Sequence, residues 1–294
     1  MTGVWDLSPS VRSEFGPLKR VLVHTPGPEI NSVVDPVAWN WEGLPRQKKV
    51  ADEHGTLVET LEDNGVIVHE LGEVHEPLAE SLFVRDVAFA IEGGMCIGKM
   101  DGPDRQGEER RMTERCVDLG MPIYHTVHGS GIFEIGNVVW IDEETVAIGR
   151  SRTTNAEGIR QVRTLFETYG IDVVEVPIFG STESTGQTHL ALVFSMIDRD
   201  ISLLYPPAVP DEFIDLLEDR NIEVIEVPMR EQRNRVTSTV VLEPGSVLLP
   251  AGNQRVSSEL RDQGVDVTEL SIRETKKAGG GLKGLILPLE RAPS

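Results

Sequence analysis

Cysteine is scarce in this chain: it occurs only at Cys96 and Cys116 among 294 residues. Two cysteines cannot build a disulfide framework or a multi-cysteine zinc site, so both thiols are expected to be reduced. The sequence also lacks an apolar run of the roughly 18 residues that would span a bilayer. Its first residues have neither the basic start nor the apolar core of a signal peptide. These absences predict a soluble, cytoplasmic protein that does not bind membranes.

Positive charge is scarce as well. The chain has 28 Lys and Arg against 48 Asp and Glu, which gives a formal net charge of −20 at pH 7. Nucleic-acid binding requires many basic side chains that neutralise phosphates, so we expect a small molecule and not a nucleic acid as partner. The acidity fits either a salt-rich cytoplasm or an ordinary well-charged surface, and neither identifies a function. Association into homo-oligomers is left open.

Five segments share one pattern, in which an amphipathic helix is followed at once by an alternating strand. The helices are expected to end at Gly65, Gly120, Gly170, Asn221 and Gly264. Glycine and asparagine adopt the left-handed conformation that stops a helix. The pattern recurs at intervals of about 50 residues, which predicts a modular α/β fold.

Hairpins are predicted between these units, because pairs of apolar runs flank short polar turns. The turns are expected at Gly93–Gly94, Glu143–Glu144, Asp198–Asp200 and Pro244–Gly245. A single copy of hairpin, helix and strand cannot bury both faces of its strands, so the copies must pack on one another. The first and last apolar runs, residues 18–26 and 282–290, look alike and are expected to meet in a closing module.

Two irregular stretches interrupt the repeats. Residues 101–111 are strongly polar and are predicted to form a surface loop. The segment from residue 25 to about residue 49 contains Trp39 and Trp41, and a loop of this length in a compact domain is usually functional or disordered. The tryptophans argue against disorder. Two interpretations stay open, a lid over a site or a loop that packs its rings for stability alone.

Several motifs, in their order along the chain, resemble the guanidine-modifying superfamily of amidinotransferases, arginine deiminases and dimethylarginine dimethylaminohydrolases. They are FGPLKRVLVHTP (15–26), FVRD (83–86), GRSRTTNAEG (149–158), THLALVFSMIDRD (188–200), LEPGSVLLPAGN (242–253) and GGGLKGLILPLER (279–291). The resemblance implies a pentein, a closed α/β propeller of five ββαβ modules with pseudo-five-fold symmetry, formed by one domain over residues 1–294. It also implies cysteine chemistry on a guanidinium carbon, assisted by a histidine and by carboxylates.

The resemblance assigns roles to four residues. Asp86 matches the acid of the F-x-R-D motif and would hold the substrate's terminal nitrogens. Glu134 matches the first residue of E-G-G-D, and His189 matches the histidine of H-L-D, which would transfer protons. Arg152 matches a position that often pairs with the α-carboxylate of amino-acid substrates. Carboxylates suit a planar cation, because each charge-assisted hydrogen bond contributes about 1.5–3 kcal/mol.

Four positions depart from the family pattern, and at one of them Ile135 replaces the first glycine of E-G-G-D. Asn137 and Ala191 stand where the E-G-G-D and H-L-D motifs have acids, and Gly284 occupies the expected place of the nucleophilic cysteine. No cysteine follows Cys116, and loss of the attacking group costs a covalent mechanism on the order of a million-fold in rate. Cys96 and Cys116 are surrounded by apolar residues and are expected to be inert.

The sequence therefore supports a hydrolase-type enzyme that acts on an arginine-like guanidino or related C–N substrate without the usual cysteine. The alternative is a catalytically inactive ligand-binding or regulatory homologue on the same scaffold. A third hypothesis, a ribosome-binding factor with the propeller fold, conflicts with the acidic charge. The remaining histidines show no metal-ligand spacing, so neither a metal nor a cofactor is expected.

Overall fold

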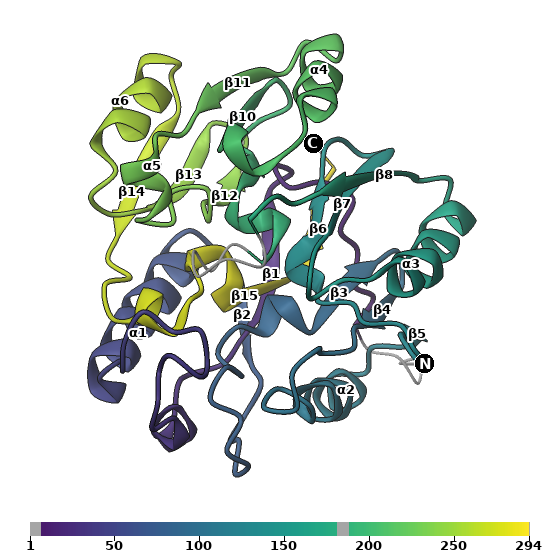
Figure 1. Ribbon diagram of the computed structural model, residues 1–294, viewed down its shortest axis with the longest axis vertical. Coiled ribbons are helices and arrows are strands. Elements are labelled where there is room, and N and C mark those ends of the chain that lie inside the picture. Colours follow the sequence, from purple (N-terminus) through teal and green to yellow (C-terminus); the bar gives the residue numbers. More distant parts are fainter. Residues whose placement is uncertain (1–6, 181–187, 294) are drawn as a thin grey trace.

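The strands of the computed structural model form five sheets of three strands each. The structure describes residues 7–180 and 188–293. In every sheet the central strand pairs antiparallel with one neighbour and parallel with the other. The sheets are arranged around a common centre and the longer helices lie on the outside (Figure 1). The predicted closed propeller of five ββαβ modules is therefore confirmed.

Four of the modules are continuous in sequence. Their elements are β3 (Ala88–Ile91), β4 (Gly94–Ile97), α2 (Glu108–Asp118) and β5 (Ile123–Thr126); β6 (Val138–Trp140), β7 (Thr145–Arg150), α3 (Ala156–Thr168) and β8 (Asp172–Pro177); β9 (Phe194–Met196), β10 (Ile201–Leu204), α4 (Asp211–Asp219) and β11 (Glu223–Glu226); and β12 (Val240–Glu243), β13 (Ser246–Pro250), α6 (Gln254–Asp262) and β14 (Asp266–Leu270). A short helix, α5 (Met229–Gln232), joins the last two.

The fifth module combines the two ends of the described chain. It consists of β1 (Leu18–Val23), α1 (Gln47–Asp63), β2 (Ile67–Glu70) and β15 (Ile286–Arg291). β1 lies between its partners, antiparallel to β15 and parallel to β2. Leu22 is paired with Leu287 and Val23 with Ile286, as expected from the similarity of the first and last apolar runs.

The predicted helix stops are also confirmed. The φ angles of Gly65, Gly120, Gly170, Asn221 and Gly264 are 75°, 71°, 68°, 57° and 84°. Each residue adopts the left-handed conformation directly after its helix, which allows the chain to turn into the following strand. The hairpin turns lie in the four predicted polar segments.

Short 3-10 helices recur at one end of the propeller axis. η2 (Val84–Asp86), η3 (Ile135–Asn137), η4 (Leu190–Leu192) and η7 (Leu282–Leu285) each lead into the first strand of a module, or into β15. η2 contacts both η3 and η7, and η3 contacts η4. The five-fold repeat therefore brings segments that are far apart in sequence to one central place. Three further 3-10 helices are η1 (Pro28–Ser32), η5 (Pro206–Ala208) and η6 (Thr275–Ala278).

The polar stretch 101–111 differs in part from its prediction as a surface loop. Asp104 is exposed, but Arg105 and Glu108 are only 8% and 3% exposed. Arg105 is drawn inward because it pairs with Asp86 and Glu80 from another segment, and Glu108 is buried as its partner within the stretch. In the segment with the tryptophans, Trp41 is buried and its ring meets that of Trp39 edge-on.

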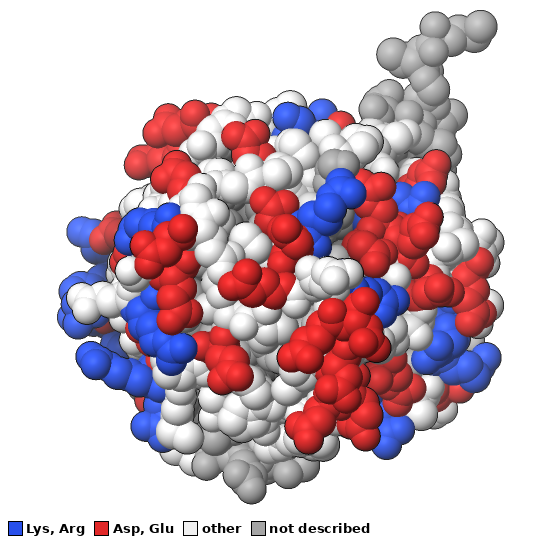
Figure 2. Space-filling model, turned by 90° about the horizontal axis from the view of Figure 1, so that it is seen from above, with Lys and Arg blue, Asp and Glu red and all other residues white. Residues whose placement is uncertain are grey.

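The excess of acidic residues in the sequence is visible on the protein surface. Acidic side chains cover much of the face shown in Figure 2, with basic side chains interspersed. Among the residues that the structure describes, no helix is long and apolar enough to cross a membrane.

Candidate active site

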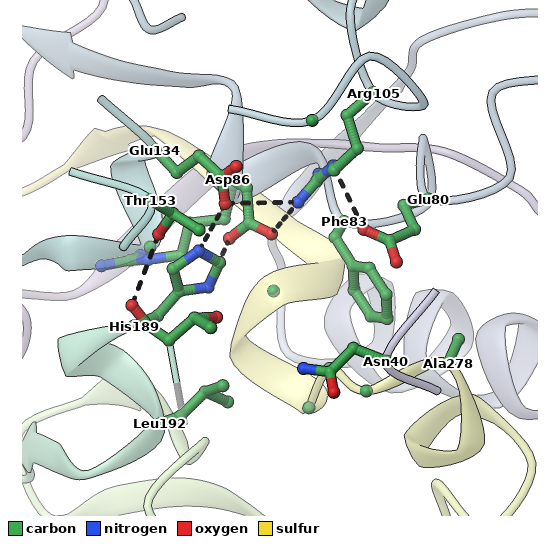
Figure 3. A pocket seen from close by; sticks show the side chains of 18 of the residues that line it. Asn40, Glu80, Phe83, Asp86, Arg105, Glu134, Thr153, His189, Leu192 and Ala278 are labelled. Atoms are coloured by element: carbon green, nitrogen blue, oxygen red, sulfur yellow. Dashed lines mark hydrogen bonds and ion pairs between the residues drawn. The ribbon is translucent and has the colours of Figure 1, made fainter. Parts of the chain in front are cut away.

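A pocket of about 200 Å³ lies where the short central helices meet. Its wall includes the residues singled out by the sequence: Asp86, Glu134, Arg152, His189 and Gly284. Residues 38–41 and the glycines 279–281 also line it. The long irregular segment of the first module therefore contributes to the pocket wall, together with residues from at least four modules (Figure 3).

His189 lies between two carboxylates. Its Nε2 atom is 2.7 Å from Oε2 of Glu134, and its Nδ1 atom is 3.5 Å from Oδ1 of Asp86. Asp86 ends η2, Glu134 directly precedes η3 and His189 directly precedes η4. The three side chains thus occupy related places in successive modules, and all three are buried. The structure brings together these three predicted site residues.

The close approach of Asp86 to His189 depends on Gly136. An added Cβ atom at this position would lie 2.6 Å from both Asp86 Oδ1 and His189 Nδ1. Real Cβ atoms essentially never come so close to other heavy atoms, and here the obstacles are two constrained side chains. Glycine is therefore required at this position for Asp86 and His189 to face each other.

The two carboxylates shift the protonation of the histidine. Burial by itself lowers the pKa of His189, but the charge of Asp86 and the hydrogen bond with Glu134 raise it above its ordinary value. Burial by itself raises the pKa of Glu134, and the hydrogen bond with His189 together with the charge of Arg105 lowers it. The geometry favours an imidazolium held by carboxylates, which can release a proton into the pocket.

Arg105 is a central residue that sequence reasoning missed. Its Nη1 atom lies 3.0 Å from Asp86 Oδ2 and 3.6 Å from Glu134 Oε2. Its Nε and Nη2 atoms form a bidentate pair with Glu108, and Nε is also 3.3 Å from Glu80 Oε2. The local sequence around Arg105 does not indicate that this side chain is buried, because its partners Asp86, Glu134 and Glu80 come from other segments of the chain. Figure 3 shows its guanidinium directed at Asp86 and Glu80.

Arg152 stands apart from this cluster, although it lines the same pocket. Its side chain is 51% exposed and its Nη1 atom lies 2.9 Å from Oδ2 of Asp101. It therefore remains accessible to a ligand at the mouth of the pocket. The structure brings Arg152 to the pocket but not into contact with the buried carboxylates and His189.

Hydrogen bonds to Thr154 and Leu190 explain why the polar side chain of Asn137 can be buried. Its amide nitrogen donates to Oγ1 of Thr154 at 2.9 Å, and its amide oxygen accepts the backbone N–H of Leu190 at 3.0 Å. An ionised aspartate could not donate the first of these bonds. Asn137 therefore fixes the start of η4, next to His189, while Ala191 is a buried residue of the pocket wall.

Gly284 lies in η7 opposite Phe83. An added Cβ atom there would be 3.2 Å from Cδ1 of the Phe83 ring, a tight contact that a small movement of the ring relieves. The neighbouring Lys283 is buried, with its Nζ atom 2.5 Å from Ser195 Oγ and 3.5 Å from Glu14 Oε2. Burial lowers the pKa of this lysine to about 8. Glu14 also pairs with Arg85 at 2.6 Å, so a buried charged cluster supports η7.

The two cysteines belong to the core. Cys96 and Cys116 are fully buried among apolar residues. Burial raises the pKa of both thiols, to about 12 at Cys116. Neither cysteine lines the pocket. Within residues 7–180 and 188–293, no group of three or more His, Cys, Asp or Glu side chains could hold a metal ion.

A closed five-module propeller whose central pocket joins a histidine to buried carboxylates defines a pentein of the guanidino-modifying type. A family model described as N,N dimethylarginine dimethylhydrolase, eukaryotic, matches residues 30–291. The chain belongs to this family, within the superfamily of enzymes that modify guanidino groups.

Individual relatives agree with this assignment. The chain is 29% identical over 282 residues to the uncharacterized protein YkgA of Bacillus subtilis (strain 168), covering 95% of this chain and 94% of the relative. It is 23% identical over 270 residues to the N(G),N(G)-dimethylarginine dimethylaminohydrolase of Pseudomonas aeruginosa, covering 92% and 98%.

Solved structures show the same fold. A mutant of the Pseudomonas aeruginosa enzyme in complex with citrulline superposes with a TM-score of 0.78 at 22% identity, covering 92% of this chain and 99% of that chain. The product-bound N-terminal domain of ArgZ, an arginine dihydrolase from cyanobacteria, superposes with a TM-score of 0.81 at 19% identity, covering 92% and 97%. At this level of identity the structures establish the pentein fold.

Proposed function

We propose that this protein binds a small molecule with a guanidino or amidine group in the central pocket and hydrolyses one of its C–N bonds without a cysteine nucleophile. The observation that carries the proposal is the position of His189 between Glu134 and Asp86, 2.7 Å and 3.5 Å away. A planar cation with several N–H donors suits carboxylates, and an imidazole held by them suits proton transfer.

In this mechanism Asp86 and Glu134 hold and orient the cationic group. His189 starts as the imidazolium: it delivers a proton to the leaving nitrogen as water adds to the amidine carbon and the C–N bond breaks, and the resulting imidazole takes up the proton that the added water loses. Arg152, at the mouth of the pocket, is available to a carboxylate on the substrate. Gly284 takes the place of the family's attacking thiol, so water has to attack the amidine carbon directly, without a covalent intermediate on the protein.

A second function, ligand binding without catalysis, is favoured by a separate observation. Neither cysteine lines the pocket, and burial raises the pKa of both thiols. A pentein that lacks an activated thiol could retain recognition and lose turnover. Both functions share the ligand class and differ in whether His189 moves a proton during a reaction.

A direct assay separates the two functions. Purified protein is incubated with arginine, agmatine and methylated arginines, and the release of ammonia, amine, citrulline and urea is followed at low and high salt. Hydrolysis that disappears in Asp86→Asn and in His189→Gln supports the enzyme. Ligand-induced thermal stabilisation without any product supports the binding protein, and the absence of both rejects the guanidino pocket.

A further inference from the structure

The chain places a guanidinium of its own among the carboxylates proposed to hold the substrate. Nη1 of Arg105 lies 3.0 Å from Asp86 Oδ2 and 3.6 Å from Glu134 Oε2. Asp86 thus directs one oxygen at His189 and the other at Arg105. The guanidinium of a substrate therefore has to bind carboxylates that are already paired with another guanidinium, that of Arg105.

Arg105 also has a second set of partners on the side away from His189. Glu108 receives its Nε and Nη2 atoms at 3.0 Å and 2.8 Å, and Glu80 lies 3.3 Å from Nε. Glu80 is fixed in turn by Trp41, whose Nε1 atom donates to Glu80 Oε1 at 2.6 Å. Arg105 therefore contacts two pairs of carboxylates, Asp86 with Glu134 and Glu80 with Glu108. The second pair can hold the side chain when its contacts with the first pair are broken.

The charges of the inner cluster compensate one another. With His189 protonated, the cations His189 and Arg105 face the anions Asp86 and Glu134. Burial raises the pKa of Glu108 to about 8 and also raises that of Glu80, which reduces the negative charge on the other two partners of Arg105 near neutral pH. A further cation that enters this buried cluster therefore finds little excess negative charge, and an unpaired buried charge is strongly unfavourable. If Arg105 leaves Asp86 and Glu134, the inner cluster gains a net negative charge that suits a cationic ligand.

We propose that Arg105 is a specificity-determining residue that competes with the substrate's cationic group for Asp86 and Glu134. The ligand binds by replacing the Nη1 contacts of Arg105, while Glu108 and Glu80 retain the displaced side chain. Simple guanidines are therefore bound weakly, and a substrate must make additional contacts in the pocket. The inference rests on the proposed function, because it concerns the same two carboxylates.

The test uses calorimetric titration with methylguanidine, which carries one cation and no carboxylate, and with L-arginine. Arg105→Gln is expected to tighten methylguanidine binding by at least about tenfold relative to the native chain. Arg152→Gln is the matched control, since it removes the same charge from the same pocket without touching Asp86 or Glu134. We expect that control to change methylguanidine binding by less than about threefold, as for a screened, half-exposed charge.

Three outcomes would overturn the inference. The first is methylguanidine binding that is unchanged or weaker in Arg105→Gln. The second is an equal gain in Arg152→Gln, which would indicate a general charge effect. The third is loss of L-arginine binding with unchanged methylguanidine binding, which would make Arg105 a contact for the substrate carboxylate. If Arg105→Gln does not fold, the double variant Arg105→Gln, Glu108→Gln removes the unpaired buried carboxylate and is subject to the same criteria.

Failure of this inference is distinguishable from failure of the proposed function. Asp86→Asn is tested alone and together with Arg105→Gln. If Asp86→Asn abolishes binding but Arg105→Gln brings no gain, the pocket binds the cation and only the competition is wrong. If Asp86→Asn leaves the binding of both probes unchanged in both backgrounds, the carboxylate pocket itself is wrong.

Discussion

Glu134 and His189 are 55 positions apart in the sequence, yet Oε2 of the carboxylate lies 2.7 Å from Nε2 of the imidazole. The two residues precede η3 and η4, which lead into the first strands of neighbouring modules. Because the modules are related by pseudo-symmetry, residues at equivalent positions in two repeats lie side by side and form a buried hydrogen bond. The chemistry that we propose for the pocket depends on this pair.

His189→Gln tests proton transfer most directly. Glutamine keeps a polar side chain of similar reach but cannot titrate, so turnover of a guanidino substrate should fall by about 10² to 10⁴-fold while ligand binding changes much less. Product release and ligand-induced thermal shift are measured in parallel. His128→Gln, at an exposed histidine outside the pocket, is the control. Turnover that survives in His189→Gln would remove the histidine from the mechanism.

Glu134→Gln tests the electrostatic coupling. The native carboxylate helps to raise the pKa of His189 above 6.5. The native imidazolium therefore contributes stability that is complete below about pH 6.5 and is lost as the pH rises through the raised pKa. The variant should move the titration of His189, followed by NMR of its ring protons, to lower pH. In the variant, the free energy of unfolding should also fall less steeply as the pH rises from about 6.5 through the native pKa of His189. An unchanged titration would contradict the coupling.

Gly136→Ala tests the close approach of Asp86 and His189. Its Cβ atom would meet both side chains at 2.6 Å, so they must separate. We expect ligand binding to fall at least about tenfold and the free energy of unfolding to drop by about 1–3 kcal/mol, the usual cost of overpacking. Gly55→Ala is the control, because Gly55 lies inside α1 with nothing within 4 Å of an added Cβ atom. That change should stabilise the protein by about 0.5–1 kcal/mol.

Gly284→Cys tests the place of the absent thiol. The new side chain requires only a small shift of the Phe83 ring, so the variant should fold. A haloacetamidine probe, which carries a cationic amidine, should label it, whereas Cys96 and Cys116 should stay unlabelled because burial raises the pKa of both thiols. Gly102→Cys places a control thiol in the wall of the same pocket, where an added Cβ atom would meet only the backbone nitrogen of Asp104, at 4.0 Å.

Labelling should be faster at position 284 than at position 102, and Asp86→Asn should abolish the difference. Equal rates at both positions would mean that the carboxylates do not guide the amidine. A folded but unreactive Gly284→Cys variant would mean that Gly284 is not oriented as the nucleophile's position requires.

The modules could be predicted from the sequence because their signals are local. Gly65 and Asn221 stop their helices through a property of their own backbone, and the alternating strands follow within a few residues. The motifs around Asp86, Glu134 and His189 are local as well. That these three residues share one site was implied by the family resemblance and not by any short stretch of sequence.

Arg105 and Lys283 could not be predicted in the same way. Arg105 sits in a strongly polar stretch, and its burial depends on Asp86, Glu80 and Glu108 meeting around it in three dimensions. Lys283 is buried because Glu14, 269 positions earlier in the sequence, reaches the same place. Charged side chains are usually exposed unless paired, so their burial becomes visible only when the partners are known.

The pairing of β1 with β15 affects how the chain folds as it is synthesised. Four modules can form in order as they leave the ribosome, but β1 has to wait for residues 286–291. A contact of such sequence separation is slow to form, because a long loop must be closed first. Gly284 and Lys283 belong to η7, which directly precedes β15, so the pocket is completed in the same step that closes the ring. A nascent or truncated chain therefore has neither a closed fold nor a complete site.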